Sequence, residues 1–263
     1  MRRIFLTAMT LAASLAVAGA AWAGPDGAGG AAGGANPPAT PPTKDAEAAT
    51  FLKELPPLMA KQSDEDARKA IARLQEIWKD KEVTDATKKP VPEILEKYGK
   101  DGKSMVASIA IEALGGLGPA GGPPLMDLLD RALKAKEPSA ETYGNCLRAI
   151  KKAADPRPAT VKGLLELLKY KLDDVVAKAA DAISGYKDAP GKVRREMLEE
   201  VIKQSEGVFS SSKDAKNGSA VTKWRIIQGS VLSALNALSG QQFADPSAAR
   251  AWFNDHKKDK QWD

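Results

Sequence analysis

From Asp45 onward, apolar residues recur at intervals of three and four, in short segments that glycine and proline interrupt. This spacing places apolar side chains on one face of a helix, and the interruptions mark the ends of helices. The pattern predicts helices over residues 45–61, 63–79 and 92–98, the last ending at Gly99. We therefore expect an all-α protein.

A five-residue pattern occurs four times further along the chain. It reads small or apolar, apolar, polar, alanine, then leucine or isoleucine, at spacings of 36, 33 and 52 residues. The copies span residues 110–114, 146–150, 179–183 and 231–235. A second apolar pattern follows the first three copies at the same offsets, through Leu129, Leu165 and Leu198. Because one helical hairpin cannot cover its own apolar face, the repeats predict hairpins that stack on their neighbours.

The longest spacing implies an insertion, which we place at residues 207–219 and expect to form a loop. Loops carry binding functions more often than the scaffold does. Val208 and Phe209 are candidate apolar contacts within it, and the alternative is that they pack beneath the loop. At the start of the next helix we expect Trp224 to pack against the previous repeat and Arg225 to be exposed.

These repeats, each with a proline-led second helix, resemble HEAT-type (armadillo-like) repeats of the short kind found in exported bacterial proteins. The segment 235–243, followed by Trp252-Phe253, is similar to the ending of such proteins. The resemblance covers residues 103–258, and 45–102 more loosely. It implies a right-handed α-solenoid of stacked helical hairpins. Tetratricopeptide repeats are the alternative, although their Leu-Gly-x-x-Tyr signature is missing.

The C-terminus concentrates bulky aromatic residues. The last repeat of such a stack needs a cover, and Phe243, Trp252 and Phe253 are suited to that role. Trp262 lies beyond a polar run, so we expect it to be the exception.

The N-terminus combines Arg2 and Arg3, an apolar stretch over residues 4–20 and an Ala-Trp-Ala site. This is typical of a secretory signal peptide, here over residues 1–23 and cleaved after Ala23. An uncleaved anchor and a twin-arginine signal are the alternatives. Residues 24–44 hold six glycines and five prolines, which predicts a disordered linker, with a ligand for a proline-binding domain as the alternative. Irregular N-terminal helices over 45–102 and the repeats over 103–263 complete the predicted organisation of an exported, periplasmic or secreted protein.

The composition excludes several kinds of chemistry. With one Cys and one His in 263 residues, an internal disulfide and the usual zinc sites are excluded. Cys146 occupies a small core position and is expected to be a buried thiol, while His256 is expected to be solvated near the fraying end. Gly102-Lys103-Ser104 matches the end of a P-loop, but Lys97 stands where that loop needs its first glycine. We therefore expect no cofactor and no enzyme.

The distribution of charge limits which kinds of partner the sequence predicts. The net charge of +5 is mild, and the polar position of the repeats reads Glu112, Arg148, Asp181 and Ser233, with no continuous basic track. Nucleic acid and a membrane are therefore not expected partners, and a small molecule is less favoured than a protein. The candidate partner-binding residues are Arg148, Lys151, Lys152, Lys178, Val208, Phe209 and Arg225. The sequence favours a non-enzymatic scaffold or adaptor. A ligand carrier or lyase-like helical-repeat enzyme, and a self-associating envelope component, are the alternatives.

Overall fold

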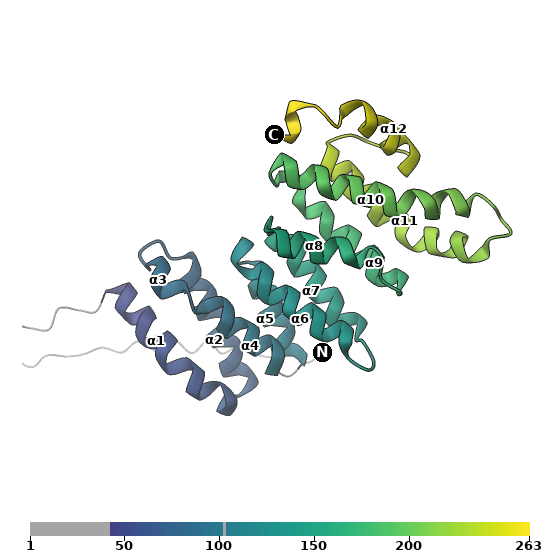
Figure 1. Cartoon of the computed structure of the whole chain (residues 1–263). Helices are drawn as coiled ribbons and strands as arrows, with labels where there is room; N and C mark the ends of the chain where they lie inside the picture. Colours follow the sequence, from purple (N-terminus) through teal and green to yellow (C-terminus); the bar gives the residue numbers. More distant parts are fainter. Residues whose placement is uncertain (1–42, 102–103) are drawn as a thin grey trace, which may run out of the picture. The chain divides into compact units, whose positions relative to one another are not determined.

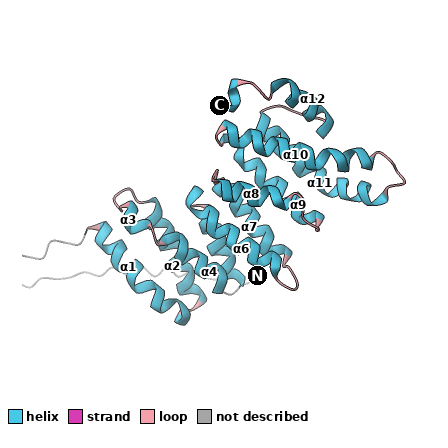
Figure 2. Cartoon of the chain, viewed as in Figure 1, coloured by secondary structure: helices cyan, strands magenta, loops and turns pink. Residues whose placement is uncertain are grey.

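The computed structural model describes residues 43–101 and 104–263, and Figure 2 shows helices and loops but no strands in these ranges. The all-α prediction is confirmed. The helices are α1 (Lys44–Leu58), α2 (Asp64–Lys79), α3 (Asp85–Lys88), α4 (Val91–Asp101), α5 (Ser104–Gly115), α6 (Gly122–Lys134), α7 (Ala140–Ala153), α8 (Pro158–Leu167), α9 (Asp173–Ile183), α10 (Gly191–Ser212), α11 (Gly218–Ser239) and α12 (Pro246–His256). Short 3₁₀ turns occupy Met59–Lys61 (η1), Gly118–Gly121 (η2), Ser184–Asp188 (η3) and Lys260–Trp262 (η4).

The predicted leader, and the predicted linker up to residue 42, lie outside the described residues. Lys44 already begins α1, because the Thr43 side chain accepts a hydrogen bond from the Ala46 N–H and caps the first turn. Within residues 43–101 and 104–263, none of the helices combines the length and apolarity needed to cross a membrane.

The helices pack in two rows (Figure 1). In the first row α2, α5, α7, α9 and α11 each contact the next, and in the second row α4, α6, α8, α10 and α12 do the same. Contacts such as α4 with α5, α6 with α7 and α10 with α11 join the rows. The buried apolar residues therefore form one continuous cluster between the rows.

The four copies of the sequence pattern lie on α5, α7, α9 and α11, at equivalent places in the first row. Their apolar and alanine positions are buried, except for the half-buried Leu232. The polar position is exposed at Glu112, Arg148 and Ser233, and half-exposed at Asp181. The polar position therefore marks the solvent side of the first row.

Small residues allow neighbouring helices to approach closely. A Cβ at Gly115 would lie 2.9 Å from the Ala149 carbonyl oxygen and 3.1 Å from its Cβ. Gly99 was expected to end a helix, yet it lies inside α4, where a Cβ would sit 2.8 Å from Leu128 Cδ1. At both positions the glycine provides space for a neighbouring helix.

The prediction of a loop over residues 207–219 was wrong for all but residues 213–217. Helices α10 and α11 instead continue side by side into this segment (Figure 1). The apolar face of α10 continues through Val208 and Phe209, and the Phe209 ring lies 5.1 Å from that of Trp224 on α11. Each helix thereby gives the other a partner, which overrides the loop-like composition. The prediction that Trp224 packs against the previous repeat is confirmed.

This distal hairpin, residues 206–226, contains no fully buried residue. The stability of the folded distal hairpin therefore depends largely on the contact between the Phe209 and Trp224 rings. Phe209→Ala is expected to accelerate amide hydrogen exchange within residues 206–226 by at least about fivefold, since such a pair contributes roughly 1 kcal/mol beyond its buried area. Exchange at Leu198 and Val201 should not change. Ser210→Ala, at an exposed position of the same helix, is the control, and an equal acceleration throughout the chain would contradict a local role.

The aromatic C-terminal cover is larger than predicted. Phe253 is buried, and the rings of Phe243 and Trp252 lie 5.7 Å apart. The expectation that Trp262 stands outside this cover was wrong, because Trp262 is only 4% exposed and its Nε1–H donates to the His256 carbonyl at 2.8 Å. His256 is not solvated and frayed, because its ring stacks on Trp252 at 4.6 Å. The polar run before Trp262 turns back and brings the indole onto the last helices.

Candidate functional site

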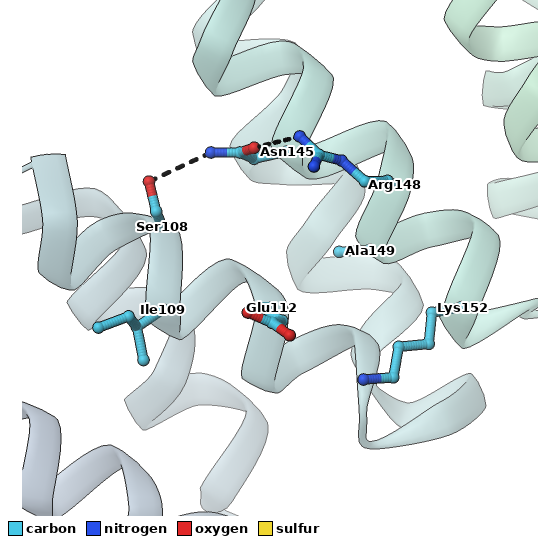
Figure 3. A pocket seen from close by; sticks show the side chains of 7 residues that line it. All are labelled: Ser108, Ile109, Glu112, Asn145, Arg148, Ala149 and Lys152. Carbon is cyan, nitrogen blue, oxygen red and sulfur yellow. Dashed lines mark hydrogen bonds between the residues drawn. The ribbon is translucent and has the colours of Figure 1, made fainter.

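A hollow of about 340 Å³ lies between α5 and α7, on the solvent side of the first row (Figure 3). We refer to it below as the α5–α7 hollow. It is lined by Ser108, Ile109 and Glu112 from α5, and by Asn145, Arg148, Ala149 and Lys152 from α7. Two of the seven residues predicted to bind a partner, Arg148 and Lys152, are therefore brought together here.

Helix α7 supplies the positive charge of the hollow. Arg148 and Lys152 are four residues apart, and so share one face of the helix. Both side chains are exposed and extend from α7 toward α5 (Figure 3). An Arg148 Nη2–H donates to Asn145 Oδ1 at 2.7 Å, and Asn145 Nδ2–H donates to Ser108 Oγ at 3.1 Å. This chain of hydrogen bonds directs the guanidinium toward the hollow.

Helix α5 supplies one carboxylate, from Glu112, and an apolar wall, from Ile109. Among the ion pairs formed within residues 43–101 and 104–263, none includes Glu112, Arg148 or Lys152. In contrast, many other lysines and arginines of the same ranges are paired with a carboxylate. The hollow therefore presents two cations and one anion that the fold leaves available for a ligand.

The neighbouring seam between α7 and α9 uses its charges internally. Lys151 Nζ lies 2.8 Å from Asp181 Oδ1. Lys178 Nζ pairs with Asp174 and lies 5.5 Å from the centroid of the Tyr143 ring. Lys151 and Lys178 were predicted to bind a partner, and each ammonium group already contacts the adjacent helix, at Asp181 and at the Tyr143 ring respectively. Neither lines the α5–α7 hollow.

Contacts in the same seam shift the pKa values of Tyr143 and Asp174. The Tyr143 hydroxyl donates to Asp174 Oδ2 at 2.7 Å, and this bond, followed by burial, raises the pKa of Tyr143 to about 12. The hydrogen bond from the Lys178 ammonium, assisted by that from Tyr143, lowers the pKa of the Asp174 carboxyl despite its desolvation. Both shifts favour the hydrogen-bonded arrangement at neutral pH.

Tyr143 should make stability depend on pH in alkaline solution. In the unfolded chain a tyrosine ionises near pH ~10, whereas the folded pKa is about 12. Between these values the unfolded state loses a proton that the native state keeps, so the contribution of Tyr143 is complete below pH ~10 and falls as pH rises. The free energies of unfolding of wild type and Tyr143→Phe, measured by denaturant titration, should therefore converge as pH rises over this range. A Tyr143 titration near pH 10 in the folded protein would contradict this expectation.

The remaining candidates lie elsewhere, on α10 and α11. Arg225 is exposed, as predicted, while Phe209 packs on Trp224. Val208 lines a second hollow, of about 280 Å³, at the junction of α8, α9, α10 and α11. Its other walls are mixed: Leu168, Val176, Val201, Ile227 and Val231 are aliphatic, and Lys169, Gln204, Ser205 and Lys223 are polar.

Sequence reasoning missed the polar residues that orient Arg148. Asn145 precedes Arg148 by three residues on α7, and Ser108 precedes Asn145 by 37 residues in the chain. That separation is close to the repeat spacing of 36, which was the only available signal. Short polar residues near corresponding places of two repeats can bridge adjacent helices.

The structure offers few reactive groups. Cys146 is fully buried, and burial raises the pKa of its thiol to about 12, so the nucleophilic thiolate is suppressed. In the described part of the chain, no group of three or more His, Cys, Asp or Glu side chains is arranged to hold a metal ion. The charged residues that line the α5–α7 hollow, Arg148, Lys152 and Glu112, can form ion pairs and hydrogen bonds with a ligand.

Comparisons with known proteins add little to this description. No protein-family model matches the chain, and no curated protein matches its sequence. A crystal structure of an engineered protein from the Northeast Structural Genomics Consortium is similar at 18% identity and a TM-score of 0.36, with 75% of this chain and 98% of that chain covered. A likeness at that level gives no basis for assigning a family or a function.

Proposed function

We propose that this chain is a non-enzymatic scaffold or adaptor that binds a protein partner through the α5–α7 hollow. The observation that carries the proposal is the pair Arg148 and Lys152. Both are exposed over the hollow and form no ion pair with another residue of 43–101 or 104–263, while the charges of the neighbouring seam are paired. Oriented cations on rigid helices bind a complementary surface with little ordering cost.

The two rows of helices support a right-handed α-solenoid of HEAT-like hairpins as the scaffold. In that arrangement the hollow lies along the face formed by successive first-row helices. The leader pattern supports export, with cleavage after Ala23 and residues 24–44 as a tether. These assignments are part of the proposal.

Charge in the α5–α7 hollow favours a protein over a nucleic acid. Glu112 lies beside the two cations, and Lys151 on the adjoining turn is paired with Asp181. A phosphate backbone needs a run of available cations rather than two of them beside a carboxylate. A partner surface with mixed polarity is a better match.

A ligand carrier is the second candidate function, because the hollow beside Val208, with six aliphatic residues among the ten that line it, has a volume of about 280 Å³. That volume is about twice that of the engineered cavity that binds benzene. Incubation of the purified protein with an apolar fluorescent probe would detect such a site. Val176→Phe should remove the signal by filling the hollow.

Capture of the partner tests the main proposal. The full chain, tagged at its C-terminus and produced in its native cell envelope, is crosslinked briefly, and the recovered proteins are identified by mass spectrometry. The double variant Arg148→Ala/Lys152→Ala should lower recovery of one specific protein by at least about tenfold. The matched control is Lys192→Ala/Arg195→Ala, at two exposed positions of α10. Equal recovery with both double variants would overturn the proposal.

A further inference from the structure

We infer that the α5–α7 hollow receives one aspartate or glutamate side chain from an extended segment of the partner. This inference rests on the proposed function and specifies the chemistry of the group that is recognised. It follows from the orientation of Arg148, the charge balance of the hollow and the space within it.

The orientation of Arg148 suits a carboxylate. A guanidinium has five N–H donors in a fixed plane, and Arg148 uses one of them to hold Asn145 Oδ1. Asn145 is itself held by Ser108, so Arg148 has an internal partner that favours this orientation before a ligand arrives. The remaining donors can form two parallel hydrogen bonds to a carboxylate, which is the geometry that arginine supports and lysine does not.

The charge balance selects a single monoanion. Arg148 and Lys152 contribute two positive charges and Glu112 one negative charge, so one carboxylate neutralises the hollow. A phosphate dianion would bring its second charge close to Glu112, where like charges repel. Glu112 can also accept a hydrogen bond, and the backbone N–H groups of an extended segment can provide one.

The hollow is larger than a carboxylate group, so a ligand that fills it must supply further atoms. Its volume of about 340 Å³ corresponds to roughly ten water molecules. Ile109 and Ala149 form an apolar wall for the methylene groups of a side chain. The Asn145–Ser108 hydrogen bond and the close approach of Gly115 to Ala149 hold α5 and α7 together on either side of Glu112. The hollow is thus a fixed recess for one side chain and its adjoining backbone.

Capped peptides provide a direct test. The probe is the peptide Ala-Ala-Glu-Ala-Ala with an acetylated N-terminus and an amidated C-terminus. The control peptide has Gln in place of Glu. Binding to the full chain is followed by nuclear magnetic resonance, at the Asn145 side-chain amide and the Arg148 Nε–H. We expect saturable shifts with the Glu peptide, a dissociation constant on the order of millimolar, and no saturation with the Gln peptide.

Variants of exposed residues should change this affinity in opposite directions. Arg148→Lys keeps the charge but loses the planar pair of donors, so binding should weaken by about tenfold. Glu112→Gln removes the repelling carboxylate, so binding should tighten by about threefold. Arg195→Lys, at an exposed arginine of α10, should change nothing. Equal effects of Arg148→Lys and Arg195→Lys would overturn the inference.

Two further probes distinguish other sources of negative charge. An all-alanine peptide with a free C-terminus tests a terminal carboxylate, and inorganic phosphate tests a dianion. Tighter binding of either than of the Glu peptide would overturn the inference. If no peptide binds while partner capture still depends on Arg148 and Lys152, the inference fails and the proposed function stands. If capture does not depend on them, the proposed function fails even where the Glu peptide binds.

Discussion

Replacing Asp155 with alanine is expected to lower the free energy of unfolding by about 3 kcal/mol. The Asp155 side chain is fully buried between α7 and α8. Its Oδ1 accepts from Nε and the backbone N of Arg157 at 2.7 and 3.2 Å, and its Oδ2 accepts from Thr160 Oγ at 2.6 Å. The variant leaves the buried Thr160 hydroxyl and the Arg157 amide without an acceptor.

The expected loss is large because Asp155 also connects two repeats. Arg157, which Asp155 orients, donates to the Pro119 carbonyl in η2. The Asp155 side chain packs against Gly122 at the start of α6, where a Cβ would collide with it. Asp155→Asn keeps the volume and one acceptor, so a loss of about 1–2 kcal/mol is expected. Urea denaturation measures both values, and a loss below about 1 kcal/mol for Asp155→Ala would contradict this role.

Trp262→Ala is expected to lower the free energy of unfolding by about 3 kcal/mol, although Trp262 is the penultimate residue. The indole is 4% exposed and lies 6.4 Å from the Phe253 ring, centroid to centroid. Arg194 of α10 lies over the indole at 5.5 Å and donates to the Gln261 carbonyl at 3.1 Å. Removing the ring leaves a cavity over α10 and α12.

Gln261→Ala is the matched control for this variant. Gln261 is exposed and contributes only its backbone carbonyl to the contact with Arg194, so its substitution should change stability by less than about 0.5 kcal/mol. Thermal unfolding of both variants distinguishes the contribution of the indole to stability from that of the chain end. Equal stability of Trp262→Ala and wild type would show that the C-terminus does not cover the last helices.

The helical elements could be predicted from the sequence because their signals are local. The spacing of apolar residues alone places α5, α7, α9 and α11, and the buried positions of each repeat follow the pattern. The extension of α10 and α11 could not be predicted in this way. Gly207, Ser210 and Gly218 favour a loop locally, and only the contact between Phe209 and Trp224 shows why the helices continue. Trp262 was missed for the same reason, since its partners lie on α10 and α12.

The candidate site could be predicted only in part. The polar position of the repeat indicated Arg148 and hence the exposed side of the row. It could not show that Lys151 pairs with Asp181, because that pair depends on which side chains meet between α7 and α9, whereas Asp174 and Lys178 pair within α9 at a spacing of four residues. The bridge from Asn145 to Ser108 is likewise a contact between helices. The residues that remain available for a partner are therefore defined by packing.

Site-specific photocrosslinking tests the central claim most directly. A photoreactive amino acid is placed at Glu112, an exposed residue of the α5–α7 hollow, or at Asp130, an exposed residue of α6 in the other row. In the cells that produce the protein, we expect the residue at 112 to crosslink to one distinct protein and the residue at 130 not to do so. Crosslinking at 130 but not at 112, or adducts only between copies of this chain, would contradict partner binding through the hollow.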